Sequence, residues 1–159
     1  MEQKPQSPYQ VKIIADTNII FSCLLNTNGK IGDLLFNSDG IFEFYSCDYM
    51  RYEIEKHWDK LKRISNLSEE KLKESRFKLF TKINFINEEL IPAKTWLVAE
   101  QIVNDIDVDD SDFVALTKHL KGGLWTGDKE LYIGLKSKNF KRVYYTSELI
   151  VLRDKKSKS

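Results

Sequence analysis

Apolar residues in this chain occur in two patterns, short continuous runs and helical spacings. The first run, VKIIA at residues 11–15, is short and rich in β-branched residues, so it predicts a buried strand. Similar runs predict strands at residues 41–47, 124–126 and 142–146. Continuous apolar composition, rather than alternation, is typical of parallel strands covered on both faces.

Helical spacing dominates the segments between these runs. Apolar residues three or four positions apart predict a pair of helices forming a helical hairpin over about residues 50–88. Ser68 starts the second of these helices, because a serine caps a helix and the two glutamates after it favour its first turn. Further helices are predicted from Pro92, around Phe113 with an end at Gly122 and Gly123, and over residues 129–135.

Strands separated by helices predict an α/β fold with a central, mainly parallel, twisted sheet. No repeat, low-complexity segment or linker divides the chain of 159 residues, so we expect one domain over residues 10–152. The polar ends, residues 1–9 and 153–159, are expected to be flexible.

Composition excludes few functions, because 42% hydrophobic and 31% charged residues are those of an ordinary globular protein. The net charge of +1 favours neither nucleic acid nor a membrane. The charge is unevenly placed, however. Lysines and arginines gather in the middle of the chain, and five aspartates fall within eight positions: Asp105, Asp107, Asp109, Asp110 and Asp112.

Cys23 and Cys47 lack metal-type spacing and lie in apolar surroundings, so we interpret them as small buried residues of a reducing compartment. The polar N-terminus contains two prolines and resembles neither a signal peptide nor a membrane anchor. No apolar run approaches the roughly 18 residues needed to cross a bilayer. These features predict a cytoplasmic protein without a membrane partner.

Four acids are expected at the carboxyl ends of the strands, where parallel sheets bind their ligands. Asp16 and Asp128 follow predicted strands, and Glu53 and Asp110 lie near the starts of predicted helices. Taken alone, the aspartates are explained by helix capping, and Glu53 by an ordinary position on a helix surface. Capping does not require that all four share one edge of the sheet, which makes a functional cluster the sharper hypothesis.

Clustered carboxylates repel one another unless a cation lies between them. Oxygen ligands suit Mg²⁺ or Mn²⁺, and such a cation activates water for attack on a phosphodiester. Thr17, Asn18 and Thr126 are expected to orient the carboxylates. An EF-hand, a zinc site and a phosphate-binding glycine loop are disfavoured, because the required residues are missing at the required spacings. His57 is interpreted as a helix-surface residue.

Several segments, in order, resemble those of the PIN domain family: IIADTNII, CDYMRYEIEKHW, DVDDSDFVALTKHL and LWTGDKEL. The resemblance runs from about Val11 to Leu149, and the first DTN and the late TGDKEL are its most specific parts. It implies a three-layer α/β/α sandwich and a metal-dependent ribonuclease activity, in many prokaryotic members as a VapC-like toxin of a toxin–antitoxin pair.

Carried over by position, the resemblance assigns the acidic site to Asp16, Glu53 and Asp128. Asp107, Asp109, Asp110 and Asp112 compete for the remaining position. In the family this acid usually lies three residues before the first apolar residue of the next helix, so Phe113 selects Asp110, which lies 18 residues before Asp128. Asp112 is the second choice, as a neighbour of the ligands.

The partners expected from the resemblance are an RNA substrate, an antitoxin protein and a second copy in a homodimer. The lysine-rich helices of residues 50–88 depart from the compact toxin pattern and offer a surface for the RNA backbone, although solvated lysines are an equal explanation. The alternative function is a catalytically silent PIN-like module that binds RNA or protein. A phosphoaspartate switch or phosphatase fits less well, because Asn18 stands where a phosphatase needs its second acid.

Overall fold

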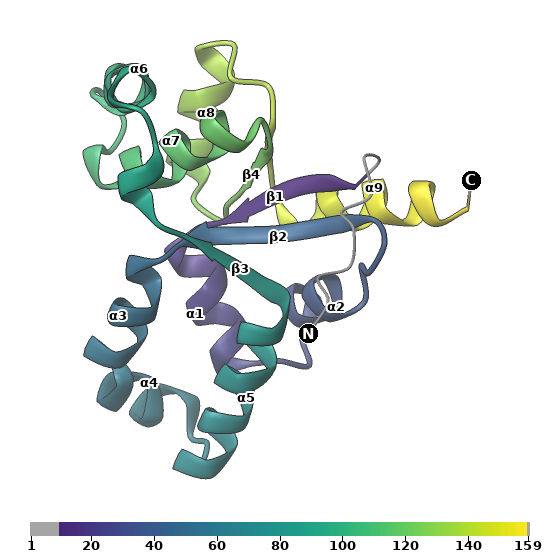
Figure 1. Cartoon of the computed structure of the whole chain (residues 1–159). Helices are drawn as coiled ribbons and strands as arrows, with labels where there is room; N and C mark the ends of the chain where they lie inside the picture. Colours follow the sequence, from purple (N-terminus) through teal and green to yellow (C-terminus); the bar gives the residue numbers. More distant parts are fainter. Residues whose placement is uncertain (1–9, 159) are drawn as a thin grey trace.

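The computed structural model describes residues 10–158 (Figure 1). Five strands form one sheet: β1 (Val11–Ala15), β2 (Phe42–Cys47), β3 (Ile83–Ile86), β4 (Gly123–Trp125) and β5 (Val143–Tyr144). Their order is β3-β2-β1-β4-β5, and every neighbouring pair is parallel. The predicted α/β class with a parallel sheet is confirmed.

Helices connect the strands and cover the sheet. The first half of the described chain contains α1 (Thr17–Leu25), α2 (Lys30–Phe36), α3 (Tyr49–Lys56), α4 (Trp58–Ser65) and α5 (Glu69–Lys82). The second half contains α6 (Ala93–Val103), α7 (Ser111–Leu120), α8 (Lys129–Ser137) and α9 (Thr146–Ser157), with short 3₁₀ turns η1 (Glu88–Leu90) and η2 (Val108–Asp110).

The layers form an α/β/α sandwich. Figure 1 shows α6, α7 and α8 on one side of the sheet and α1, α2 and α5 on the other. The central strand β1 explains this arrangement, since Ile13, Ile14 and Ala15 are fully buried and need apolar neighbours on both faces. Helix α7 packs on β1, β2 and β4, while α1 packs on α4 and α5.

Cys23 and Cys47 are free and buried in this core, as predicted. Burial raises the pKa of the Cys23 thiol to about 12, so it stays protonated at neutral pH. Within residues 10–158, no helix has the length and apolar character that a membrane crossing requires.

The predicted helical hairpin over residues 50–88 was too long. Its second helix begins after Ser68, whose hydroxyl accepts a hydrogen bond from the Lys71 amide at 3.2 Å, as expected. It ends at Lys82, however, and Ile83–Ile86 pairs with β2 as strand β3. Pairing with β2 satisfies the backbone of this β-branched and aromatic segment, so the helical spacing of its two isoleucines was misleading.

The end of α7 also differs from expectation. Helix α7 stops at Lys121, which adopts the left-handed conformation (φ 54°), so the following glycines are not the cap. Gly122 is needed for packing instead, because a Cβ there would lie 2.6 Å from the Lys12 carbonyl oxygen.

The C-terminal end is helical rather than flexible over residues 153–157, which belong to α9. Arg153 explains this order, since its guanidinium bonds to the Asp33 carboxylate of α2 at 3.2 Å. The other end predicted to be flexible, residues 1–9, lies outside the described residues, as does residue 159.

Candidate active site

Asp16 lies at the carboxyl end of the central strand and caps α1. Its amide donates to the Trp125 carbonyl at 3.3 Å, which holds the end of β1 beside the end of β4. One carboxylate oxygen accepts from the Ile19 amide at 3.0 Å. The side chain is buried, with 4% of its surface exposed, and burial raises its pKa, while hydrogen bonds from Thr126, Ile19 and Asn18 act in the opposite direction.

Asp128 follows β4 and caps α8. Its carboxylate accepts from the amides of Glu130 at 2.9 Å and Leu131 at 3.2 Å. Its own amide donates to the Thr126 hydroxyl oxygen at 3.0 Å. Since the Thr126 hydroxyl also bonds to Asp16, this threonine links the two aspartates. The expected orienting role of Thr126 therefore has a structural basis.

Asp110 stands at the N-cap position of α7 but makes no capping bond with its side chain. Its Oδ2 atom is buried and has no hydrogen-bond partner within the described part of the chain. The pKa of Asp110 is raised to about 7, first by burial and then by the negative charges of Asp107, Asp16, Asp128 and Asp109. Asp110 therefore lies within electrostatic range of both strand-end aspartates.

Glu53 is placed differently from these three aspartates. It lies half-buried on the second turn of α3, rather than the first, and its carboxylate is 3.3 Å from Nε2 of His57. The His57 ring also meets Phe21 edge-on. Burial raises the pKa of Tyr49, and the charges of Asp112, Cys47 and Glu53 add to the effect. Glu53 is not among the charges that shift Asp16 or Asp110. Glu53 therefore lies beside His57 and within electrostatic range of Tyr49, and its place among the acids of the site stays a prediction.

Asp112 belongs to a second acidic group near the ends of β2 and β3. Its pKa is raised by burial and by the charge of Glu88, and lowered by a hydrogen bond from Tyr49. The Tyr49 amide donates to Glu88 at 2.7 Å. Asp112 therefore faces away from the group of Asp16, Asp110 and Asp128, as the helical period predicts for a residue two positions from Asp110.

Glu88 was not predicted as a site residue, because residues 83–86 were assigned to a helix. Once β3 is recognised, Glu88 becomes an acid just beyond the carboxyl end of a parallel strand. The same rule that selected Asp16 and Asp128 would have found it. A β-branched and aromatic segment, INFI, was the available signal.

Asn18 and Thr17, the other two residues expected to orient the carboxylates, differ in what they contact. Asn18 is exposed, and its backbone amide, rather than its side chain, interacts with Asp16. The Thr17 hydroxyl donates to the Met50 sulfur at 3.3 Å and also meets Tyr49. Thr17 is thus directed toward α3 and the second acidic group.

The aspartate group has the electrostatic character of a cation site, because three carboxylates share one edge and one buried oxygen lacks a partner. Carboxylate oxygens of Asp16 and Asp128 already accept hydrogen bonds from amides at the starts of α1 and α8, however. No three His, Cys, Asp or Glu side chains of residues 10–158 are arranged so that they could hold one metal ion. The oxygen donors of this group are of the kind that a hard divalent cation prefers.

A comparison with curated proteins finds none that matches this chain. The family model described as PIN domain, in contrast, matches residues 14–148, which include Asp16, Glu53, Asp110 and Asp128. This match covers most of the chain and agrees with the observed parallel sheet and its helical layers. The chain therefore belongs to the PIN domain family.

Proposed function

We propose that this PIN domain is a metal-dependent endoribonuclease that hydrolyses RNA phosphodiester bonds. PIN domains are generally nucleases and typically use divalent metals, which supports the reaction class. The observation that carries the proposal is Asp110, a half-buried acid with an unpartnered oxygen, whose pKa is raised by burial and by the charges of Asp107, Asp16 and Asp128. A divalent cation is the natural partner for such a group.

Asp16, Asp110 and Asp128 are the proposed ligands of Mg²⁺ or Mn²⁺, and Glu53 is the proposed fourth acid at the side of the site. When bound, the cation would lower the pKa of an attacking water and offset charge on the phosphate. The protein holds the ligands in place beforehand: the Ile19 amide fixes Asp16, and two amides of α8 fix Asp128. The Thr126 hydroxyl bonds to the Asp16 side chain and to the Asp128 backbone amide, and thus connects the two residues.

Asp16→Asn and Asp110→Asn test this proposal, since each keeps the shape of the side chain and removes the charge. Both variants should cut single-stranded RNA at least about 100-fold more slowly than the wild type. EDTA should stop the wild-type reaction, and added Mn²⁺ should restore it. Asp109→Asn is the matched control, an exposed acid one position from Asp110 that should leave cleavage unchanged.

Cleavage that persists in EDTA, or in both variants, would contradict the assignment. A wild-type protein that binds RNA without cutting it in Mn²⁺ would support the silent binding module instead. Asp112→Asn separates the two acidic groups, and we expect a smaller loss than for Asp110→Asn because Asp112 interacts with Glu88 and Tyr49.

We also propose that this chain forms a homodimer and that an antitoxin protein binds it. Exposed apolar side chains on α6, Leu97 at 60% and Val98 at 38% exposure, support a protein contact on this helix. Sedimentation of the purified chain should give twice the monomer mass, and Leu97→Lys should shift it to the monomer. The neighbouring reading frame is the direct check for an antitoxin.

A further inference from the structure

A cationic pocket lies at the opposite end of β4 from the acidic group. It has a volume of about 300 Å³, and its lining contains Lys118, Lys121, Lys141 and Arg142 but no acidic residue. Residues from three places form it: the end of α7, the first residues leading into β4, and the loop between α8 and β5. At about 3.3 Å per residue, Gly122 at this pocket is about 13 Å of strand away from Thr126 at the acidic group.

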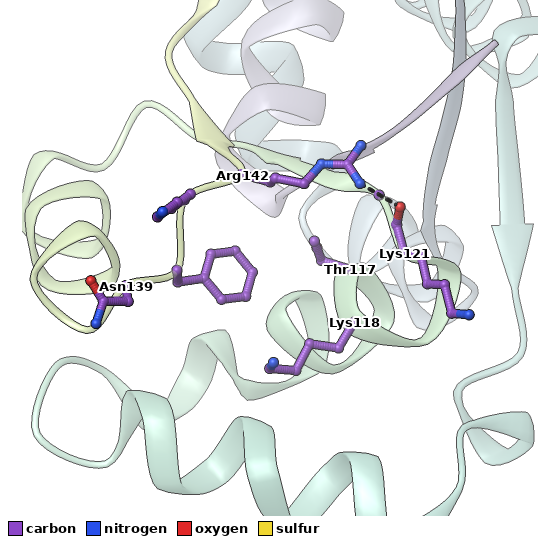
Figure 2. A pocket seen from close by; sticks show the side chains of 8 residues that line it. Thr117, Lys118, Lys121, Asn139 and Arg142 are labelled. Atoms are coloured by element: carbon purple, nitrogen blue, oxygen red, sulfur yellow. Dashed lines mark hydrogen bonds between the residues drawn. The ribbon is translucent and has the colours of Figure 1, made fainter. Parts of the chain in front are cut away.

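The side chains of the pocket are arranged by contacts within it (Figure 2). Arg142 donates to the Lys121 carbonyl at 2.8 Å, which ties the start of β5 to the end of α7. Figure 2 shows Lys118 extending from α7 toward the loop that carries Asn139, and its ammonium lies 5.6 Å from the centre of the Phe140 ring. The guanidinium and ammonium groups retain further donors for a ligand.

The positive charge of this pocket is not compensated by neighbouring acids. Elsewhere in residues 10–158 some cations pair with a carboxylate, including Arg76 with Glu55 and Lys82 with Asp39. None of the four cations of the pocket forms an ion pair with a described residue: Lys118, Lys121, Lys141 and Arg142. Such a concentration of one sign attracts an anion.

Helix electrostatics account for only part of this arrangement. The C-terminal end of α7 favours Lys118 and Lys121, because unpaired carbonyls give that end a partial negative charge. Lys141 and Arg142 come from another segment, although Arg142 also donates to the Lys121 carbonyl at the end of α7. A planar guanidinium beside ammonium groups and an aromatic ring matches the phosphate, and the adjoining base, of a nucleotide.

We propose that the pocket of Lys118, Lys141 and Arg142 binds a phosphate group of a nucleotide, either within a nucleic-acid strand or on a free nucleotide. The strand source rests on the proposed function, since it places RNA across both the acidic group and this pocket. Binding of a free nucleotide does not depend on the proposed function. The two sources share one chemistry and are separated by the ligand used in the test.

Binding of a fluorescent ten-nucleotide single-stranded RNA, measured by polarisation in EDTA, tests the pocket without cleavage. Lys118→Gln with Lys141→Gln is the pocket variant, because both side chains are exposed and their replacement leaves the backbone bonds intact. Lys73→Gln with Lys78→Gln on α5 is the control with the same change in charge. Thermal unfolding should show that both double variants are folded.

The pocket variant should bind the RNA at least about tenfold more weakly. Log affinity should also depend less steeply on log salt concentration, with a slope smaller in magnitude by about 1.4 for two lost phosphate contacts. The α5 control should lose less than threefold, because Lys73 and Lys78 do not line the pocket. Arg142→Gln should weaken binding in the same direction. Equal losses in the pocket variant and the control, or no loss in either, would overturn the proposal if the pocket variant also binds 5′-adenosine monophosphate as the wild type does.

Titration with 5′-adenosine monophosphate distinguishes the sources. Saturable binding to the wild type that the pocket variant lacks assigns the pocket to free nucleotides. RNA binding that depends on the pocket but is not displaced by the mononucleotide assigns it to a strand. The nuclease function is tested separately. A protein that binds RNA through this pocket but does not cut it with Mn²⁺ would support the pocket proposal and contradict only the proposed cleavage activity.

Discussion

At the scale of single residues, the three aspartates of the acidic group differ in the hydrogen bonds that their carboxylates accept. Asp16 and Asp128 each accept backbone hydrogen bonds at a helix start, which stabilise the charged form. Asp110 has no such bonds and carries a pKa raised to about 7. Burial raises the pKa of Asp16 as well, so two aspartates of the group have raised pKa values in the metal-free protein.

Asp110→Asn should stabilise the metal-free protein at pH 8. Because the folded-state pKa of Asp110 lies above its ordinary value, the folded state holds the proton more tightly, and the free energy of unfolding of the wild type falls as pH rises from about 4 to about 7. Asparagine does not ionise, so the variant does not lose this free energy of unfolding as the pH rises. We expect a gain on the order of 1 kcal/mol at pH 8, after discounting for solvent screening, and almost none at pH 4.5. Urea unfolding in EDTA at both pH values measures it, and an equal gain at both would contradict the assigned cause.

Thr126→Val should destabilise the fold, because it keeps the buried shape and removes the hydroxyl that links Asp16 to Asp128. The Asp128 amide would lose its acceptor, for an expected loss of about 1–3 kcal/mol in the free energy of unfolding. Thr126→Ser is the control, since it retains the hydroxyl and should recover most of the loss. Chemical denaturation compares the three proteins, and a valine variant as stable as the wild type would refute the link.

At the scale of elements, close contacts between backbones determine where strands can lie. Gly122 precedes β4 and approaches the Lys12 carbonyl of β1 too closely for a side chain. The same junction ends α7 and opens the cationic pocket, so its geometry affects the sheet and the pocket together. In contrast, a Cβ at Gly127 would meet nothing within 4 Å.

Gly122→Ala should therefore lower the free energy of unfolding by about 1–3 kcal/mol, because β4 or β1 must move to accommodate the methyl group. Gly127→Ala is the matched control and should change stability by less than about 0.5 kcal/mol. Thermal and urea unfolding of both variants give the comparison. Equal stability of the two variants would show that the close approach to Lys12 is relieved without displacement.

At the scale of the whole molecule, the two ends of the sheet carry opposite charge. Acids gather at the carboxyl ends of the strands, while the cations of the pocket lie at the starts of β4 and β5. The lysine-rich helices α4 and α5 contribute less free charge than their composition suggests, because Lys62, Lys71 and Arg76 each meet a carboxylate. The net charge of +1 hides this separation.

A divalent cation that binds the folded state should raise the melting temperature of the whole protein. At a Mn²⁺ concentration 100 times its dissociation constant, mass action supplies about 2.7 kcal/mol, or roughly 5–10 °C for a domain of this size. Scanning calorimetry in Mn²⁺ and in EDTA measures the shift. Asp128→Asn should abolish the shift and Asp109→Asn should retain it; a wild type that melts identically in both buffers would contradict the metal site.

The sequence by itself determined the parts of this protein that depend on local pattern. VKIIA predicted β1 correctly because β-branched runs of that length favour strands, and Ser68 marked the start of α5 because its hydroxyl serves the backbone three residues on. The position of Asp16 at a sheet edge followed from the same pattern. The order of acids along the chain was also sufficient to indicate the family.

Only the tertiary structure decided which of these acids meet. Residues 83–86 became a strand because β2 offered hydrogen bonds that no local pattern could show, and this placed Glu88 at the strand ends. Asp110 joined Asp16 and Asp128 while Asp112 turned toward Tyr49, since two helical positions separate their directions in space. Side chains from distant segments interact through the packing of sheet and helices, and electrostatic partners are fixed by that packing rather than by distance along the chain.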